Sequence, residues 1–190
     1  HGSAIEILQR MTGEPVPGGW QGGLPFTYRI SGGPELTLRI RVDQPKGLVT
    51  ISDVVGTLRG EDFPDEWVIL GSHYDAWSFG AEDPNGGTAM LLTLAESLGQ
   101  LAREGQRPRR TIKIGHWDAE EFGMVGSVEW VEEHREQLKR SAVAYINADV
   151  AVSGPSFHSA AAPTLKSVII GATHEVEHPD SSLTLYETWN

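Results

Sequence analysis

Three groups of side chains that can bind a metal ion each stand just after a short apolar segment of the sequence. The groups are His73 with Asp75, then Asp118 with Glu120 and Glu121, and finally Asn147 with Asp149. Imidazole nitrogen and carboxylate oxygen are ligands that zinc accepts in proteins. One polar group after an apolar segment is common, but three in succession are hard to explain as ordinary loop polarity. The pattern therefore indicates a metal site assembled from three separate parts of the chain.

Two further features suit a site that holds two metal ions. Asp83 lies in a loop that leads into a predicted helix, where its carboxylate could bridge two zinc ions about 3.5–4 Å apart. Of the adjacent Glu120 and Glu121, one carboxylate can bind metal while the other stays free as a general base. Asp75, two residues after His73, is placed to orient the imidazole.

Each of these features taken alone also has a purely structural explanation. A lone His73 would most often be a core or surface histidine. The pair Glu120–Glu121 alone would be favoured at a helix N-terminus by the helix dipole. Residues 83–86 alone would form a turn before a helix. Their combination in one order along the chain favours the ligand interpretation.

The remaining histidines are expected to be structural or surface residues: His116, His134, His158, His174 and His178. The last two stand four residues apart and could pair on one face of a helix as a metal site. Nothing else in the sequence supports that pairing, so neither is assigned to the site.

The elements that must position these side chains alternate between strands and helices. The predicted strands are residues 67–71, 111–115 and 142–146, and the predicted helices are residues 87–101, 126–138 and 164–177. This alternation is typical of an α/β fold with a largely parallel, mixed sheet flanked by helices. In open sheets of this kind the functional crevice lies at the carboxyl ends of the strands. We therefore expect the three groups to meet there.

The first part of the chain has a different character. Its predicted elements are the end of a helix at 4–11, a loop rich in Gly and Pro at 13–34, a half-buried strand at 36–42 and a second strand at about 48–58. We place a domain boundary between residues 1–46 and residues 47–190.

Composition narrows the classes of partner. The chain of 190 residues carries 26 acidic and 15 basic residues and a net charge of -11. Nucleic acid and anionic membranes attract basic surfaces, so neither is expected as a partner, and no apolar run reaches membrane-spanning length. There is no cysteine, which excludes disulfides and thiolate ligands. Any zinc must be bound by His, Asp and Glu.

Several motifs together resemble one family. They are Gly71–Trp77, Gly80–Pro84, Arg107–Thr111, Trp117–Gly123, Tyr145–Asp149 and Leu185–Trp189. In this order and spacing they resemble the glutamate carboxypeptidase II and transferrin-receptor-like branch of the cocatalytic zinc exopeptidases. The resemblance runs from about residue 50 to the end. It reaches weakly into residues 1–46, which resemble the tail of a protease-associated domain and the return to the catalytic domain.

The resemblance implies a role for each matched site residue. His73 and Asp149 would hold one zinc, Glu121 would hold the other, and Asp83 would bridge both. Glu120 would be the proton shuttle that activates the bridging water. The family's second zinc also needs a histidine, which we expect beyond residue 190. The implied fold is that of an aminopeptidase-like zinc exopeptidase, incomplete at the C-terminus.

The function implied by the resemblance is hydrolysis of a terminal peptide bond, of carboxypeptidase or aminopeptidase type, with a peptide as substrate. The alternative is a non-catalytic receptor or scaffold, as in the transferrin-receptor branch, which has lost zinc ligands. Every ligand position that this chain covers is intact, and so is the Glu120 base, which favours the enzyme. A third possibility is a folding unit without activity.

Four expectations follow for the chain and its protein. The 190 residues by themselves should not turn over peptides, because the second zinc would lack its histidine. The 190-residue chain should form a homo-oligomer, since its sheet would end at an unpaired edge near residues 142–146 or at a neighbouring strand. The resemblance suggests an extracellular, periplasmic or membrane-anchored location. The Asp83–Pro84 bond should be cis, because an X-Pro bond adopts cis at a cost of only about 0.5–1 kcal/mol and related exopeptidases place a cis peptide there.

Overall fold

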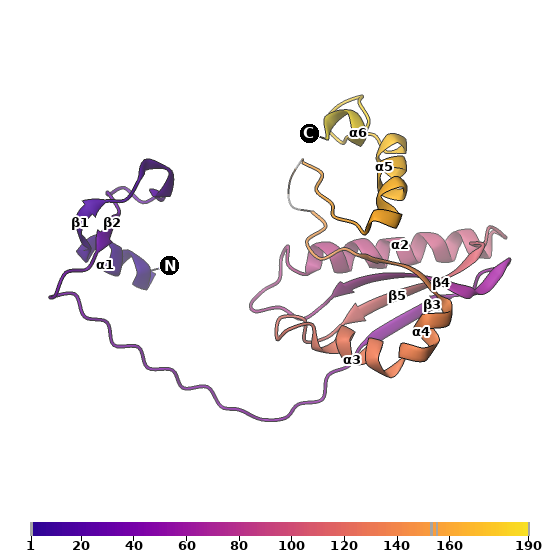
Figure 1. Ribbon diagram of the computed structural model, residues 1–190, viewed down its shortest axis with the longest axis horizontal. Coiled ribbons are helices and arrows are strands. Elements are labelled where there is room, and N and C mark those ends of the chain that lie inside the picture. Colours follow the sequence, from indigo (N-terminus) through magenta and orange to yellow (C-terminus); the bar gives the residue numbers. More distant parts are fainter. Residues whose placement is uncertain (1, 153, 155, 190) are drawn as a thin grey trace. The chain divides into compact units, whose positions relative to one another are not determined.

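The computed structural model describes residues 2–152, 154 and 156–189. The chain divides into two compact units, His1–Leu48 and Val49–Asn190, which are described separately (Figure 1). No helix in the described part of the chain is long and apolar enough to cross a membrane.

The first unit is a helix followed by a small two-stranded sheet. Its elements are α1 (Gly2–Arg10), β1 (Thr12–Pro15), the 3-10 turn η1 (Gly18–Trp20) and β2 (Arg29–Ser31). β1 and β2 pair antiparallel. The side chain of Gln21 connects the segments around them, because its Nε2 donates to the carbonyl of Val16 and its Oε1 accepts from the amide of Tyr28. The short strands were not expected within the predicted loop at 13–34.

The strand predicted at residues 36–42 is wrong. Residues 36–53 have no regular secondary structure, and a strand begins only at Val54. The apolar side chains of the predicted strand are exposed, with Ile40 at 81% of its full accessible area. A strand is stabilised by hydrogen bonds to a neighbouring strand, and among the described residues none pairs with this segment. The alternation of apolar and polar residues alone was therefore insufficient to predict a strand here.

The second unit is built on a four-stranded mixed sheet. Its strands are β3 (Val54–Leu58), β4 (Phe63–His73), β5 (Arg110–Trp117) and β6 (Ala142–Asn147). Their order in the sheet is β3-β5-β4-β6. β4 runs parallel to both β5 and β6, whereas β3 is antiparallel to β5. The predicted α/β fold with a largely parallel, mixed sheet flanked by helices is confirmed.

The helical elements of this unit are α2 (Asn85–Arg103), α3 (Val125–Glu133), α4 (Arg135–Ser141), η2 (Pro163–Leu165), α5 (Lys166–Glu175) and α6 (Leu185–Thr188). α2 lies along one side of the sheet, and α3 and α4 lie along the other (Figure 1). The single helix predicted at 126–138 is interrupted at His134, whose ring stacks on Trp130 with centroids 4.6 Å apart.

Buried side chains lie on both faces of the sheet, because α2 supplies Leu91 whereas Trp117 of β5 contacts Trp130 of α3, with ring centroids 5.3 Å apart. Leu91, from the middle of α2, is 1% exposed, and Ile69 of β4 and Trp117 of β5 are also buried. The ring of Trp67 is covered by the ammonium group of Lys113, 4.2 Å from the ring centroid. This core fixes the strands whose carboxyl ends carry the candidate ligands.

Candidate metal centre

The carboxyl ends of three neighbouring strands bring the candidate ligands to one edge of the sheet. In the parallel registers, His73 of β4 pairs with Trp117 of β5, and Gly71 pairs with Asn147 of β6. The segments that follow each strand therefore start side by side. This arrangement confirms that the three groups predicted from the sequence meet at this edge.

Three of the predicted ligands converge on one point. His73 Nε2 lies 3.0 Å from Asp83 Oδ1 and 2.9 Å from Asp149 Oδ1. One ligand atom from each residue lies within 4.8 Å of the other two. The side chain of His73 is 3% exposed, whereas those of Asp83 and Asp149 are 53% and 48% exposed. The cluster is thus anchored by a buried imidazole and open to solvent on its carboxylate side.

The imidazole of His73 is held by Asp75. Nδ1 lies 3.0 Å from the backbone carbonyl oxygen of Asp75 and 3.5 Å from its Oδ1. A donor on Nδ1 leaves Nε2 as the nitrogen with a free lone pair, which is the form that a metal ligand needs. The sequence placed Asp75 as an orienting partner; the closer contact is made by its carbonyl rather than its carboxylate.

The carboxylate of Asp75 instead connects His73 to the acid pair. Asp75 Oδ1 accepts from the amide of Glu120 at 2.9 Å, and Oδ2 accepts from the amide of Glu121 at 3.2 Å. The turn that carries the pair follows Ala119, which has a positive φ of 55°. Asp75 therefore sets the position of both glutamates relative to the imidazole.

The charges of the cluster shift two pKa values. Burial lowers the pKa of His73, but the hydrogen bond and negative charge of Asp149, with the charge of Glu120, outweigh it and leave that pKa raised. Burial raises the pKa of Glu120; a charged His73 opposes this shift, while Asp149 and other carboxylates add to it. Both residues thus bind a proton more readily than in water.

The loop that carries Asp83 turns sharply into α2. The Asp83–Pro84 peptide bond is cis, as predicted. Pro84 is fully buried, and Gly80 has a positive φ of 62°. Backbone amides of the first turn close the loop, with Gly86 N donating to Glu82 O at 2.8 Å. The backbone conformation before Asp83 and the hydrogen bond at the start of α2 together fix the position of Asp83.

Not every candidate lies in the cluster. Glu121 is not one of the three residues whose ligand atoms converge, although its amide is bound by Asp75. Asp118, which also follows β5, bonds the amides of Ser52 and Ala119 and thereby holds the turn. Among the described histidines only His73 belongs to the cluster. His174, for example, stacks on Tyr186 with centroids 3.8 Å apart.

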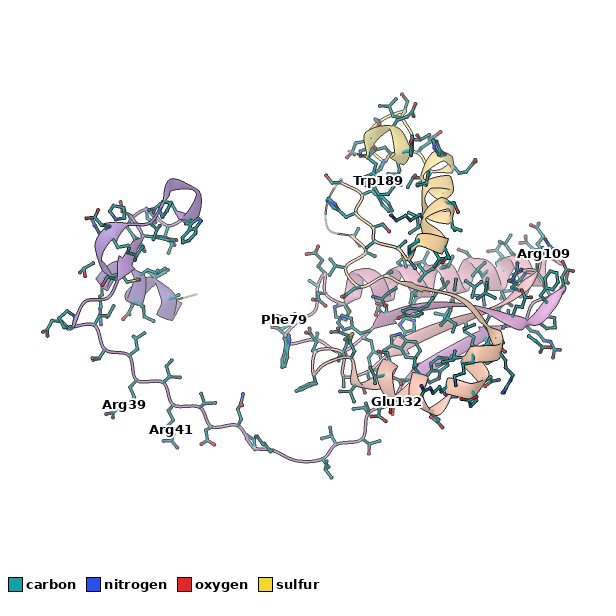
Figure 2. The ribbon with its side chains drawn as sticks, viewed as in Figure 1. Arg39, Arg41, Phe79, Arg109, Glu132 and Trp189 are labelled. Carbon is teal, nitrogen blue, oxygen red and sulfur yellow. The ribbon has the colours of Figure 1, made fainter. Side chains whose placement is uncertain are left out.

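Aromatic side chains stand close in sequence to the site residues. The rings of Trp77 and Phe122, which follow Asp75 and Glu121 closely in sequence, are 5.1 Å apart. Phe79 projects outward at one end of the second unit, and Arg109 lies at the opposite end (Figure 2). Both Trp77 and Phe79 are exposed.

The donor set fits zinc. One imidazole nitrogen and two carboxylate oxygens are ligand types found in zinc sites with an open position. The half-exposed carboxylates leave an approach from solvent, and the buried imidazole is braced through its second nitrogen. These residues could hold a zinc ion without rearrangement of the strands that carry them.

Comparison with known proteins places the chain in one family. Residues 53–185 match the model of Peptidase family M28. Over 143 residues, 75% of the chain, it is 53% identical to the probable glutamate carboxypeptidase LAMP1 of Arabidopsis thaliana, covering 21% of that protein. It is 40% identical over 197 residues, 98% of the chain, to the aminopeptidase NAALADL1 of Mus musculus, covering 26% of it.

A solved structure agrees with this placement. The crystal structure of the Peptidase M28 precursor from Shewanella amazonensis SB2B superimposes with a TM-score of 0.51 at 30% identity. The match covers 64% of this chain and 27% of that one. The chain spans about a quarter of the length of the curated relatives it matches. The chain belongs to Peptidase family M28, in its glutamate carboxypeptidase II-like branch, as the resemblance of its motifs indicated.

Proposed function

We propose that the protein carrying this chain is a zinc-dependent exopeptidase that hydrolyses a terminal peptide bond. The observation that carries the proposal is the convergence of His73, Asp83 and Asp149 at the carboxyl ends of parallel strands in a member of family M28. Relatives are named as glutamate carboxypeptidases and as aminopeptidases, so both types of terminal specificity stand as candidates.

We assign each residue the role that the motifs imply. His73 and Asp149 hold one zinc, Asp83 bridges to a second, and Glu121 is a ligand of that second ion. The contacts of His73 Nε2 with both aspartates support the first group. The separation of Glu121 from this group is what an assignment to the other ion requires.

Glu120 is the proposed general base. Bound zinc supplies a Lewis acid that polarises the scissile carbonyl and lowers the pKa of water. Glu120 accepts the proton of the attacking water and passes it to the leaving amine. Its raised pKa, caused by burial and only partly opposed by His73, suits a group that must both take and release a proton. The hydrogen bond that the backbone amide of Glu120 donates to the carboxylate of Asp75 keeps Glu120 at the edge of the cluster.

The test is hydrolysis by the purified full-length protein, with a panel of aminoacyl peptides and peptides ending in glutamate. Activity should vanish on removal of zinc, return when zinc is restored, and fall by about 10²–10⁴-fold in Glu120→Gln. The same panel of peptides distinguishes carboxypeptidase from aminopeptidase specificity. A protein that binds zinc and cleaves no member of the panel would support the receptor alternative instead.

We further propose that the protein is a homo-oligomer. We also propose that it lies outside the cytoplasm or in a membrane-anchored ectodomain, and that residues 1–46 are the remnant of a protease-associated domain. Within the described residues β6 pairs only with β4, and such an edge favours association. The location and the domain assignment rest on the resemblance of the motifs. Light scattering of the full-length protein tests the first point, and a monomer would contradict it.

A further inference from the structure

We infer that Tyr145 and Asn147 are positioning residues for the metal centre, which hold the loop that carries Asp149 through a directed chain of hydrogen bonds. The inference rests on the proposed function, because it takes Asp149 as a zinc ligand. The ligand atoms that converge are those of His73, Asp83 and Asp149.

The chain of bonds begins on β5 and ends at the last residue of β6. Trp117 Nε1 donates to the hydroxyl oxygen of Tyr145 at 3.1 Å, and that hydroxyl donates to Asn147 Oδ1 at 2.8 Å. An indole can only donate, so the hydroxyl must accept from it and spend its single proton on Asn147. The direction of the chain is therefore fixed, and a phenylalanine at position 145 would break both bonds.

Gly71 makes this contact possible. It lies on β4, between the two strands that carry the bonding partners. A Cβ atom at Gly71 would stand 2.3 Å from the Tyr145 hydroxyl oxygen and 2.5 Å from Trp117 Nε1. The hydroxyl of Tyr145 and the indole of Trp117 thus meet over Gly71, and any side chain at that position would prevent their contact.

The same loop is fixed at two further points. The amide of Ala148 donates to the carbonyl of Gly71 at 2.9 Å. The backbone of residues 148–149 passes directly over Gly87 at the start of α2, where a Cβ would lie 1.9 Å from the Ala148 carbonyl oxygen. Asp149 then reaches His73 Nε2 at 2.9 Å. The loop has little freedom, and Asn147 is the point at which a side chain restrains it.

The consequence concerns zinc affinity. A carboxylate held in place before the metal arrives binds more tightly than one that must be ordered on binding, and residues that orient ligands typically contribute about 10–100-fold in metal affinity or activity. Removing the Tyr145–Asn147 bond should therefore weaken zinc binding without removing a ligand.

The experiment measures zinc affinity of the full-length protein by competition with a chelating indicator. Tyr145→Phe and Asn147→Ala should each raise the Kd for zinc about 10-fold or more. The double variant should bind zinc as tightly as the single variant with the larger loss of affinity, because both substitutions remove the same hydrogen bond. In the zinc-free protein, hydrogen exchange of the Ala148 amide should be faster in all three variants.

The matched control is Tyr28→Phe in the first unit. It also deletes one tyrosine hydroxyl, which accepts from the amide of Leu24 at 3.4 Å, and the first unit contributes no residue to the cluster. Its zinc affinity should equal that of the wild type, and thermal unfolding should show that all variants fold.

Several outcomes would overturn the inference. They are an unchanged zinc Kd in Tyr145→Phe, additive losses of zinc affinity in the double variant, or an equal loss in Tyr28→Phe. A wild-type protein that binds zinc but hydrolyses no peptide would refute the proposed function and leave this inference standing. A wild-type protein without zinc affinity would refute both.

Discussion

At the scale of single residues, Asp75 joins two parts of the site that are far apart in sequence. Its carbonyl contacts the imidazole of His73, and its carboxylate accepts the amides of Glu120 and Glu121. Two glutamates that are neighbours in sequence are thus fixed by the same side chain. Their proposed roles nevertheless differ, and the difference is open to measurement.

Glu120→Gln should leave the zinc content of the full-length protein nearly unchanged, whereas Glu121→Gln should lower it. The reason is that only Glu121 is proposed as a ligand, while Glu120 transfers a proton. Both substitutions are isosteric and keep the amides that Asp75 binds. Metal analysis after dialysis against low zinc distinguishes the two variants, and the reverse pattern would show that the roles are exchanged.

His116 gives a prediction about pH. Burial lowers its pKa below the ordinary value of about 6.5, so the folded protein binds this proton less readily than the unfolded chain. Its contribution to stability is complete above pH 6.5 and is lost as the pH falls below that value.

The check is the free energy of unfolding at pH 7.5 and pH 5.5. It should fall less between these values in His116→Gln than in the wild type. Zinc is removed beforehand so that its release from His73 on acidification does not contribute. An equal fall in both proteins would mean that His116 titrates normally in the folded state.

At the scale of secondary-structure elements, two glycines of α2 have different surroundings: a Cβ at Gly87, in the first turn, would lie 1.9 Å from the carbonyl oxygen of Ala148, whereas a Cβ at Gly99 would have no atom nearer than 3.5 Å. Gly87→Ala should destabilise the protein and weaken zinc binding, because the new methyl group would collide with the backbone that leads to Asp149. Gly99→Ala is the matched control on the same helix, where the nearest atom to the new Cβ is the end of the Arg103 side chain at 3.5 Å. It should stabilise by about 0.5–1 kcal/mol. Thermal unfolding and zinc titration compare the pair.

The packing of α2 against the sheet yields a second comparison. Leu91→Ala should lower the free energy of unfolding by about 2–5 kcal/mol, since the side chain is fully buried. The neighbouring Leu92 is 58% exposed, so Leu92→Ala should cost far less. Denaturant titrations of both variants provide the measurement, and equal losses would mean that α2 presents another face to the sheet.

The sequence predicted the elements around the site better than those away from it. The strand predicted at 142–146 is observed as Ala142–Asn147, and the helix predicted at 87–101 as Asn85–Arg103. The helix buries Leu91 and the strand pairs with β4, so each element has the neighbour that its pattern requires. The strand predicted at 36–42 fails because alternation reports a suitable pattern and not the presence of a partner strand.

The candidate site was predictable in its members but not in its connections. The types and order of His73, Asp83 and Asp149 were sufficient to predict the cluster. The bond from Trp117 to Tyr145 was not foreseen, because it crosses three strands and depends on a glycine in the middle one. The only sequence signal for it is the glycine within an apolar strand, which indicates a close approach of other groups.

At the scale of the whole molecule, the sheet unit serves as a rigid support with an acidic opening. The net charge of -11 and the half-exposed Asp83 and Asp149 make the opening attractive to cations. The first unit has its own small sheet and contributes no residue to the cluster. The metal centre is therefore a property of the sheet unit.

Anomalous diffraction at the zinc absorption edge, from crystals of the full-length protein grown with zinc, tests the central claim most directly. The account predicts a peak about 2.0–2.2 Å from His73 Nε2 and from carboxylate oxygens of Asp83 and Asp149. A second peak should lie about 3.5–4 Å away, bound by Asp83 and Glu121. Zinc peaks only at other residues, or no peak beside His73 at saturating zinc, would contradict it.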